Sequence, residues 1–188
     1  SKLKRTKEAL SSEIKKTRSD IEHLNSILVS LDLSEDDDDL LQVKNELVQY
    51  GYIKKRSSVK DIKIKSKPLH FISSDGFDIF VGKNNYQNEE ITFKKAVSDD
   101  WWFHAKGVPG SHVIIKCEGK EPTDKTFEEA AGLAAYYSKS GKNSKVEVDY
   151  VRRKNIKKVN GTAPGFVIYH NNWSMSINPS NKLHEVKK

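Results

Sequence analysis

Residues 99–113 read Asp-Asp-Trp-Trp-Phe-His-Ala-Lys-Gly-Val-Pro-Gly-Ser-His-Val, and the rest of the chain is organised around them. The stretch holds two of the three tryptophans and two of the six histidines. Because side chains alternate along a strand, Asp100, Trp102 and His104 share one face of an extended segment. Trp101 and Phe103 then lie on the opposite face, and one of the two faces is expected to be core.

The pair Pro109-Gly110 predicts a tight turn, because proline presets one backbone angle and glycine accepts a positive one. The chain would return along residues 111–116, an arrangement that brings His112 near His104. We expect Asp100 and His104 to orient one another by hydrogen bonding beside a packed tryptophan, which would hold the turn in shape. The resulting hairpin-like platform would carry Asp100, Trp102, His104, Lys106, Ser111 and His112. For each single residue, the alternative is a packed core position.

The composition favours a polyanionic partner. The chain has 188 residues, 33 Lys and Arg against 26 Asp and Glu, and a net charge of +7. A single cysteine, Cys117, excludes a disulfide framework and is typical of a reducing, cytoplasmic location. No apolar run approaches the roughly 18 residues of a membrane span, so no membrane partner is expected. Ser1 is not a natural start, and we expect the chain to be a fragment of a longer protein.

Residues 1–31 carry a heptad pattern typical of a coiled-coil arm. The apolar seam needs a partner helix, which we expect upstream of this chain. The alternative is self-association through the same seam. One core position holds Leu3, Leu10, Thr17, Leu24 and Leu31, and the other holds Lys7, Ile14, Ile21 and Leu28.

A short acidic segment, residues 34–39, predicts the start of a second helix, since Ser34 is followed three residues later by an acid. Negative charge also suits the positive end of the helix dipole. Gly51 is the predicted end of this helix, so residues 1–52 would form the arm and a following short helix. The adjacent aspartates lack the spacing of a calcium loop, which favours a solvated helix start.

Two segments are strongly basic and could contact phosphates. Residues 53–66 are predicted to be a linker, and residues 53–67 contain Lys54, Lys55, Arg56, Lys60, Lys63, Lys65 and Lys67 against one acid, Asp61. The second segment, residues 151–158, has five cations and no acid. Its candidate RNA contacts are Arg152, Arg153, Lys154 and Lys157, and those of the platform are Lys106, Ser111 and His112.

Residues 67–180 are expected to form one α+β domain, followed by a polar tail at residues 181–188 that we expect to be frayed. Asp75-Gly76 lies between two short apolar strands, residues 69–72 and 77–81, and predicts a hairpin. A helix over residues 123–140, with a capping box at Thr126 and Glu129, would back the sheet. Further predictions are a helix at 88–97, a strand at 145–150, and a last hairpin formed by residues 166–170 and 173–177.

Residues 82–88 are predicted to be a polar loop that binds RNA. Amides can hydrogen-bond base edges, and a tyrosine ring can stack on a base. An ordinary asparagine-rich turn is an equally weighted alternative. The candidate contacts here are Lys83, Asn84, Asn85, Tyr86, Gln87 and Asn88.

Enzymatic chemistry has weaker support. Asp100, His104 and His112 could be drawn as a metal set, which would suit a metal-dependent hydrolase, but no helical His-Glu-x-x-His motif supports it. Ser111 lacks a nucleophile-elbow motif, and the chain contains no phosphate-binding loop. We therefore expect no catalytic residues, no metal and no cofactor.

The pattern Asp-x-Trp-x-His-x-Lys-x-x-Pro-Gly-Ser-His-Val, preceded by Gly-Lys-Asn-Asn-x-Gln-Asn, resembles the NFACT-R domain of the RqcH/NEMF family. The Ala-rich run at 130–138, the strand at 148–150 and the segment 164–169 are similar too. The resemblance covers roughly residues 57–180, and the preceding helices resemble the end of the family's middle coiled coil.

This resemblance implies ribosome-associated quality control. Its members bind a stalled large ribosomal subunit carrying peptidyl-tRNA, recruit aminoacyl-tRNA, and support untemplated alanine tailing; peptide-bond chemistry belongs to the ribosome. The implied partners are tRNA, that subunit and the remaining domains of the full-length protein. We expect an RNA-binding α+β domain with a mainly antiparallel sheet, one long backing helix and an N-terminal coiled-coil extension. The first alternative is a fibronectin-binding adhesin, the label long attached to bacterial members.

Overall fold

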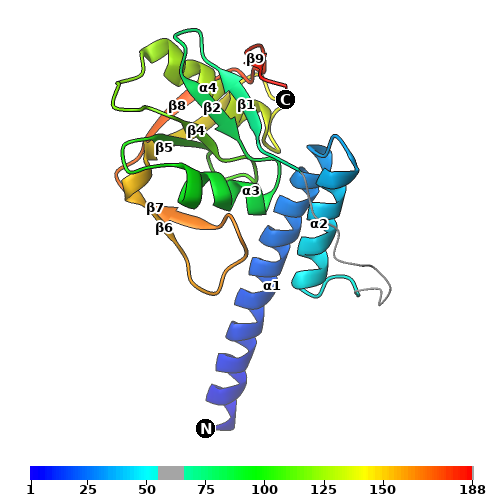
Figure 1. Ribbon diagram of the computed structural model, residues 1–188. Coiled ribbons are helices and arrows are strands. Elements are labelled where there is room, and N and C mark those ends of the chain that lie inside the picture. Colours follow the sequence, from blue (N-terminus) through cyan, green and yellow to red (C-terminus); the bar gives the residue numbers. More distant parts are fainter. Residues whose placement is uncertain (55–65, 188) are drawn as a thin grey trace.

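The protein is an α+β molecule in which a helical arm joins a sheet domain, as predicted (Figure 1). The computed structural model describes residues 1–54 and 66–187. Residues 55–65, which contain most of the predicted basic linker, lie outside the described residues. Among the helices of the described part, none is long and apolar enough to cross a membrane.

Within the described residues, seven antiparallel strands form the main sheet, in the order β8-β5-β3-β4-β2-β1-β9. The strands are β1 (Leu69–Ile72), β2 (Asp78–Val81), β3 (Trp101–Ala105), β4 (Val113–Ile115), β5 (Val146–Arg152), β8 (Trp173–Ile177) and β9 (His184–Glu185). The predicted hairpin around Asp75-Gly76 is confirmed, because β1 pairs with β2. The return of the chain after residue 110 is also confirmed, because β3 pairs with β4.

Both faces of this sheet are core, whereas the sequence predicted only one. On one face, Trp101 and Phe103 pack beneath the backing helix α4 (Asp124–Tyr136). On the other, Trp102 packs beneath α3 (Asn85–Glu90), a π-helical turn (Ile91–Lys95), and a ribbon formed by β6 (Ile156–Lys158) and β7 (Val167–Tyr169). The 3-10 turn Arg153–Asn155 joins β5 to β6. The strand alternation was therefore predicted correctly, and the second layer was not.

The arm consists of α1 (Lys2–Asp32) and α2 (Asp37–Gln49), which runs beside the C-terminal half of α1 (Figure 1). Asp36 caps α2, because its carboxylate accepts the Asp39 amide at 2.9 Å, two residues later than predicted. Gly51 follows the helix with a φ of 76°, as predicted for a terminator. The heptad seam is exposed along α1: the buried residues are instead His23, Ile27, Val29 and Ser30.

Four local predictions are wrong. Helix α3 begins at Asn85, so residues 85–88 are helical rather than a loop. Thr123, not Thr126, caps α4, and Glu129 instead accepts hydrogen bonds from Ser74. The segments 166–170 and 173–177 do not pair: β7 pairs with β6, and β8 pairs with β5. The polar tail is not free, because β9 adds an edge strand beside β1.

Candidate nucleic-acid interface

A loop hydrogen-bonded to the end of α4 joins β3 to β4, in place of the predicted tight turn. Ser111 donates its amide to the Tyr137 carbonyl, and Lys139 donates its amide to the Pro109 carbonyl, both at 2.9 Å. A Cβ on Gly110 would lie 2.8 Å from the Ser138 Cβ, so this glycine is required for close approach. The positive φ of the loop, 68°, belongs to Gly107.

An aromatic cluster lies directly behind this loop. His104 and His112 meet edge to face, with ring centroids 5.5 Å apart, which confirms that the return strand brings them together. The fully buried Trp102 stacks on His104 at 5.6 Å and contacts Tyr169 at 4.9 Å. The Thr92 hydroxyl and His112 Nδ1 are 2.8 Å apart. The four rings form one wall beneath α3 and the β6–β7 ribbon.

Both histidines are held neutral at physiological pH. Burial lowers the pKa of His104 to about 4, although Asp149 and the backbone groups of Gly110 and Ala105 oppose the change. Burial, together with repulsion from His104, lowers the pKa of His112 well below its ordinary value. The cluster therefore presents flat, uncharged rings at pH 7 and not a pair of cations.

The predicted hydrogen bond between Asp100 and His104 is wrong. The buried Asp100 carboxylate accepts the Val97 amide at 2.8 Å and the Cys117 amide at 2.9 Å, and it pairs with Lys116. Asp100 thus links the segment before β3 to the segment after β4. The partners of Asp100 within the chain are therefore Val97, Cys117 and Lys116, and not the predicted His104.

The predicted RNA-binding segment 82–88 joins the arm to the domain. Lys83 Nζ lies 2.6 Å from Asp39 Oδ1, and both side chains are almost fully buried. Burial opposes ionisation of Asp39, but hydrogen bonds from the Glu35 amide, Lys83 and Ser66 outweigh it, so the pKa of Asp39 is lowered. Asn84 caps α3 by accepting the Gln87 amide at 3.0 Å. The predicted base contacts are thus occupied within the chain.

The remaining amides of this segment have similar partners. Asn85 donates to Glu46 and to Ser26, both at 2.8 Å, and Gln87 donates to Gln42 at 2.9 Å. Asn88 Oδ1 accepts the His112 amide at 2.9 Å, and the Tyr86 hydroxyl donates to Gln49. Because Lys83, Asn84, Asn85, Gln87 and Asn88 are all buried, we leave them out of the proposed RNA surface. Ser111 and His112 are also buried.

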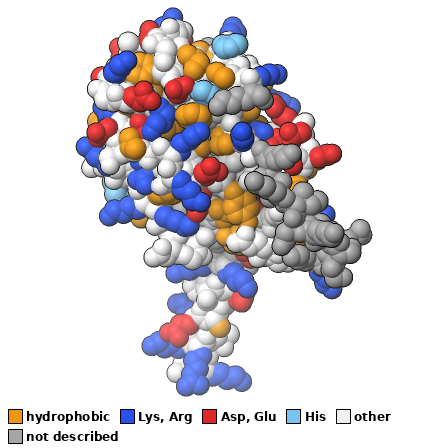
Figure 2. Space-filling view, viewed as in Figure 1, with side chains coloured by type: hydrophobic (Ala, Val, Ile, Leu, Met, Phe, Trp, Pro, Cys, Tyr) orange, Lys and Arg blue, Asp and Glu red, His pale blue; other side chains and the backbone are white. Residues whose placement is uncertain are grey.

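Exposed cations lie elsewhere on the chain, including the turns around α3 and the β6–β7 ribbon. Lys154 and Lys157 are exposed, whereas Arg152 pairs with Glu121 at 2.5 Å and Arg153 lies 4.7 Å from the Phe93 ring centroid. Lys94 and Lys95 of the π-helical turn, which were not among the predicted contacts, are also exposed. Figure 2 shows Lys and Arg side chains across this face and at the free end of the arm. Lys106, just after β3, is half exposed, and its Nζ lies 3.6 Å from Oε2 of Glu147 in β5.

The metal set considered from the sequence is not assembled. Asp100 is committed to Lys116 and two backbone amides, away from the two histidine rings. Within residues 1–54 and 66–187, no group of three or more His, Cys, Asp or Glu side chains is arranged to hold a metal ion. This donor geometry gives the hydrolase alternative no support.

Comparison with known proteins agrees with this architecture. Residues 67–171 match the model of the NFACT protein RNA binding domain, and residues 1–66 match that of the NFACT N-terminal and middle domains. The chain belongs to the NFACT family. The boundary between the two matches falls where β1 is about to begin, so the helical arm and the sheet domain are separate family regions.

Several NFACT relatives resemble the whole chain. The Rqc2 homolog RqcH of Streptococcus suis is 39% identical over 99% of this chain and 34% of its own length. RqcH of Bacillus subtilis is 36% identical over 95% of this chain and 31% of its own. A solved C-terminal part of the fibronectin/fibrinogen-binding protein from Streptococcus suis has a TM-score of 0.87 and 38% identity, covering 95% of this chain and 71% of that one. This chain spans about a third of the curated relatives' length.

Proposed function

We propose that this chain is an RNA-binding part of a ribosome-associated quality-control factor and that it binds tRNA. The observation that carries the proposal is the match of residues 67–171 to an RNA-binding domain of the NFACT family. The net charge of +7 supports the same partner. The chain is the binding module, and it has no proposed catalytic role.

The proposed contact surface combines exposed lysines from two turns. Lys94 precedes β3 and Lys154 follows β5; the Lys154 amide donates to the Ser98 carbonyl at 3.1 Å, which holds the two turns together. Lys157 extends the surface onto the ribbon, and Lys106 is a further proposed contact. Arg152 and Arg153 contact Glu121 and Phe93, respectively, and both residues are partly exposed. Such contacts bind phosphates without reading sequence.

Filter binding of purified tRNA across a salt series tests the proposal. We expect affinity to fall steeply as salt rises, because phosphate contacts release condensed counterions. The double variant Lys154→Ala/Lys157→Ala should bind more weakly and reduce the slope of log affinity against log salt by about 1–2. The matched control is Lys142→Ala/Lys145→Ala, two exposed lysines at the opposite end of β5. Absent binding at low salt, or binding insensitive to salt, would refute the proposal.

In the full-length protein, we propose that this module helps to hold aminoacyl-tRNA on a stalled large ribosomal subunit that carries peptidyl-tRNA. The name Rqc2 homolog, which its relatives carry, supports that setting. Tailing of the nascent chain with alanine would then need the remaining domains and the ribosome. This role places the protein in the cytoplasm. Ribosome profiles of cells with and without residues 67–188 of the factor would test it.

A second candidate function is attachment to fibronectin, which the description of the solved Streptococcus suis relative favours. The two functions make different demands on the chain. If the chain binds RNA, that binding should depend on Lys154 and Lys157 and weaken as salt rises. If it is not an adhesin, immobilised fibronectin should retain no more of it than immobilised albumin does. Saturable fibronectin capture that survives the lysine changes would favour adhesion.

A further inference from the structure

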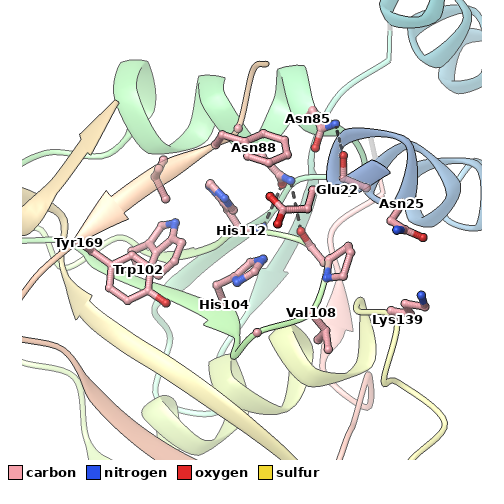
Figure 3. A pocket seen from close by; sticks show the side chains of 17 residues that line it. Glu22, Asn25, Asn85, Asn88, Trp102, His104, Val108, His112, Lys139 and Tyr169 are labelled. Carbon is pink, nitrogen blue, oxygen red and sulfur yellow. Dashed lines mark hydrogen bonds between the residues drawn. The ribbon is translucent and has the colours of Figure 1, made fainter. Parts of the chain in front are cut away.

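A pocket of about 530 Å³ opens between the arm and the sheet domain, and its lining does not include Lys94, Lys154 or Lys157. Its inner wall is the aromatic cluster of His104, Trp102 and Tyr169 from β3 and β7. Figure 3 shows these rings on one side, with Asn25 of α1 and Lys139 on the other. A volume in the range of roughly 300–1,000 Å³ is typical of small-ligand sites.

The inner wall is suited to a flat, uncharged group. His104 and Tyr169 are partly exposed, and the buried indole of Trp102 supports both rings from behind. Because burial keeps His104 and His112 neutral, the wall offers no positive charge to a phosphate. Stacking on aromatic rings is the usual way in which proteins hold unstacked bases of single-stranded RNA.

The outer wall supplies hydrogen-bonding groups that are not used within the described chain. The side chains of Glu22, Asn25 and Lys139 all line the pocket, and none makes a hydrogen bond or ion pair with another described residue. Asn25 offers one donor group and one acceptor, which can pair with a base edge. Glu22 accepts N–H or ribose O–H groups, and Lys139 can meet a phosphate at the rim.

The other polar groups of the pocket are already committed to its shape. Asn85 donates to Ser26 and Glu46 across the joint, and Asn88 accepts the His112 amide at 2.9 Å. Gly165, with a φ of 80°, lets the β6–β7 loop approach the Asn85 carbonyl, since a Cβ there would lie 3.1 Å from that oxygen. The opening is therefore held by three elements, α1, α3 and the ribbon loop, and does not depend on a single mobile loop.

We infer that this pocket holds one unstacked nucleobase of a single-stranded RNA segment, stacked on His104 and Tyr169, with its ribose beside Glu22 and a phosphate at Lys139. The inference rests on the proposed RNA binding and adds to it a site that takes one base. The lysine surface would supply affinity that is independent of sequence, whereas the pocket would require a flipped-out base. Duplex RNA, whose bases are stacked, would reach the lysines only.

Fluorescence anisotropy with two labelled hexamers of equal charge tests the inference: hexauridylate, and the same ribose-phosphate chain without bases. We expect the full chain to bind hexauridylate about tenfold more tightly, because the abasic chain cannot stack. Asn25→Phe, which places a ring in the pocket, should remove that difference. Asn45→Phe, the same change at an exposed site on α2, should leave it intact.

The outcomes separate this inference from the proposed function. Equal, salt-sensitive binding of both hexamers would overturn the pocket and leave RNA binding standing, whereas binding of neither would overturn both. A base-dependent difference that survives Asn25→Phe would also overturn the pocket, because another site would then read the base. Asn25→Ala leaves the space open and should reduce the difference only partly. If Asn25→Phe melts at a lower temperature than Asn45→Phe, Asn25→Ala is used instead. An Asn25→Ala protein with the parent difference in affinity between the two hexamers would then overturn the inference.

Discussion

His104 and Asp149 are paired across β3 and β5, and this aspartate, not Asp100, is the acidic residue opposite the motif histidine. Asp149 Oδ2 accepts a hydrogen bond from the Tyr169 hydroxyl at 2.8 Å, and Ser174 donates to the other oxygen. The carboxylate favours a protonated imidazole, but burial of His104 outweighs it. The aromatic wall therefore stays uncharged beside an acid.

The neutral state of His104 predicts a loss of stability on mild acidification. Its pKa is about 4 in the folded chain and ordinarily near 6.5, so between these values the unfolded state binds the extra proton. Stability therefore rises with pH across this window and falls as pH is lowered from 7 to 4, by roughly 2–3 kcal/mol from this residue. Urea unfolding at pH 7, 5.5 and 4.5 measures the change, to which His112 adds in the same direction.

His104→Gln is the variant that separates this contribution from general acid effects. It keeps a polar side chain but cannot titrate, so its unfolding free energy should depend less on pH than that of the parent chain. His170→Gln, at an exposed position, should retain the parent dependence. An identical pH dependence in all three proteins would show that His104 is not the titrating group.

Asp100→Ala should destabilise the sheet domain severely, by about 3–5 kcal/mol, because it removes the buried partner of a charged group. The change leaves the Lys116 ammonium and the Val97 and Cys117 amides without their acceptor. Its neighbour Asp99 is exposed and provides a matched control. Asp99→Ala should shift the unfolding free energy by less than about 0.5 kcal/mol. Equal effects of the two changes in urea unfolding would contradict this assignment.

The sequence was sufficient where a strong local signal decided the structure. Asp75-Gly76 specified a hairpin, and alternation placed Trp101 and Trp102 on opposite faces of β3. It was insufficient where the chain packs on itself through polar groups. Residues 82–88 contain few apolar side chains, so periodicity could not show that their amides are buried against Ser26, Gln42 and Glu46.

The apolar pattern of the arm was incomplete for a related reason. Heptad spacing identifies the seam of α1, but that seam does not face the domain. The surface that meets α2 and α3 includes buried polar groups, and His23 Nε2 and Glu46 Oε1 lie 2.8 Å apart within it. The spacing of apolar residues along a helix cannot reveal an interface made of polar ones. The candidate pocket could not be predicted for the same reason, because α1 contributes the polar residues Glu22 and Asn25 to its lining.

Lys83→Ala should loosen the arm from the domain. It would leave the buried Asp39 carboxylate without its cation, and breaking a buried pair in this way costs roughly 3–5 kcal/mol. Hydrogen exchange of the amides in α2 and α3 should accelerate before that of the central strands. Lys44→Ala, at an exposed position on α2, is the control and should leave exchange unchanged. Unaltered protection of α2 in Lys83→Ala would show that the ion pair does not hold the joint.

The last prediction concerns the exposed seam of α1. Leu10, Ile14 and Ile21 are 60%, 46% and 53% exposed, and an isolated helix is only marginally stable in water. In dilute solution, amides of residues 2–18 should exchange quickly; at higher concentration, chains should pair through the seam and protect them. Ile14→Lys/Ile21→Lys should abolish pairing in sedimentation, whereas Ser12→Lys/Ser19→Lys, equal in charge but off the seam, should not. A monomer whose residues 3–31 are fully protected from exchange would contradict the prediction.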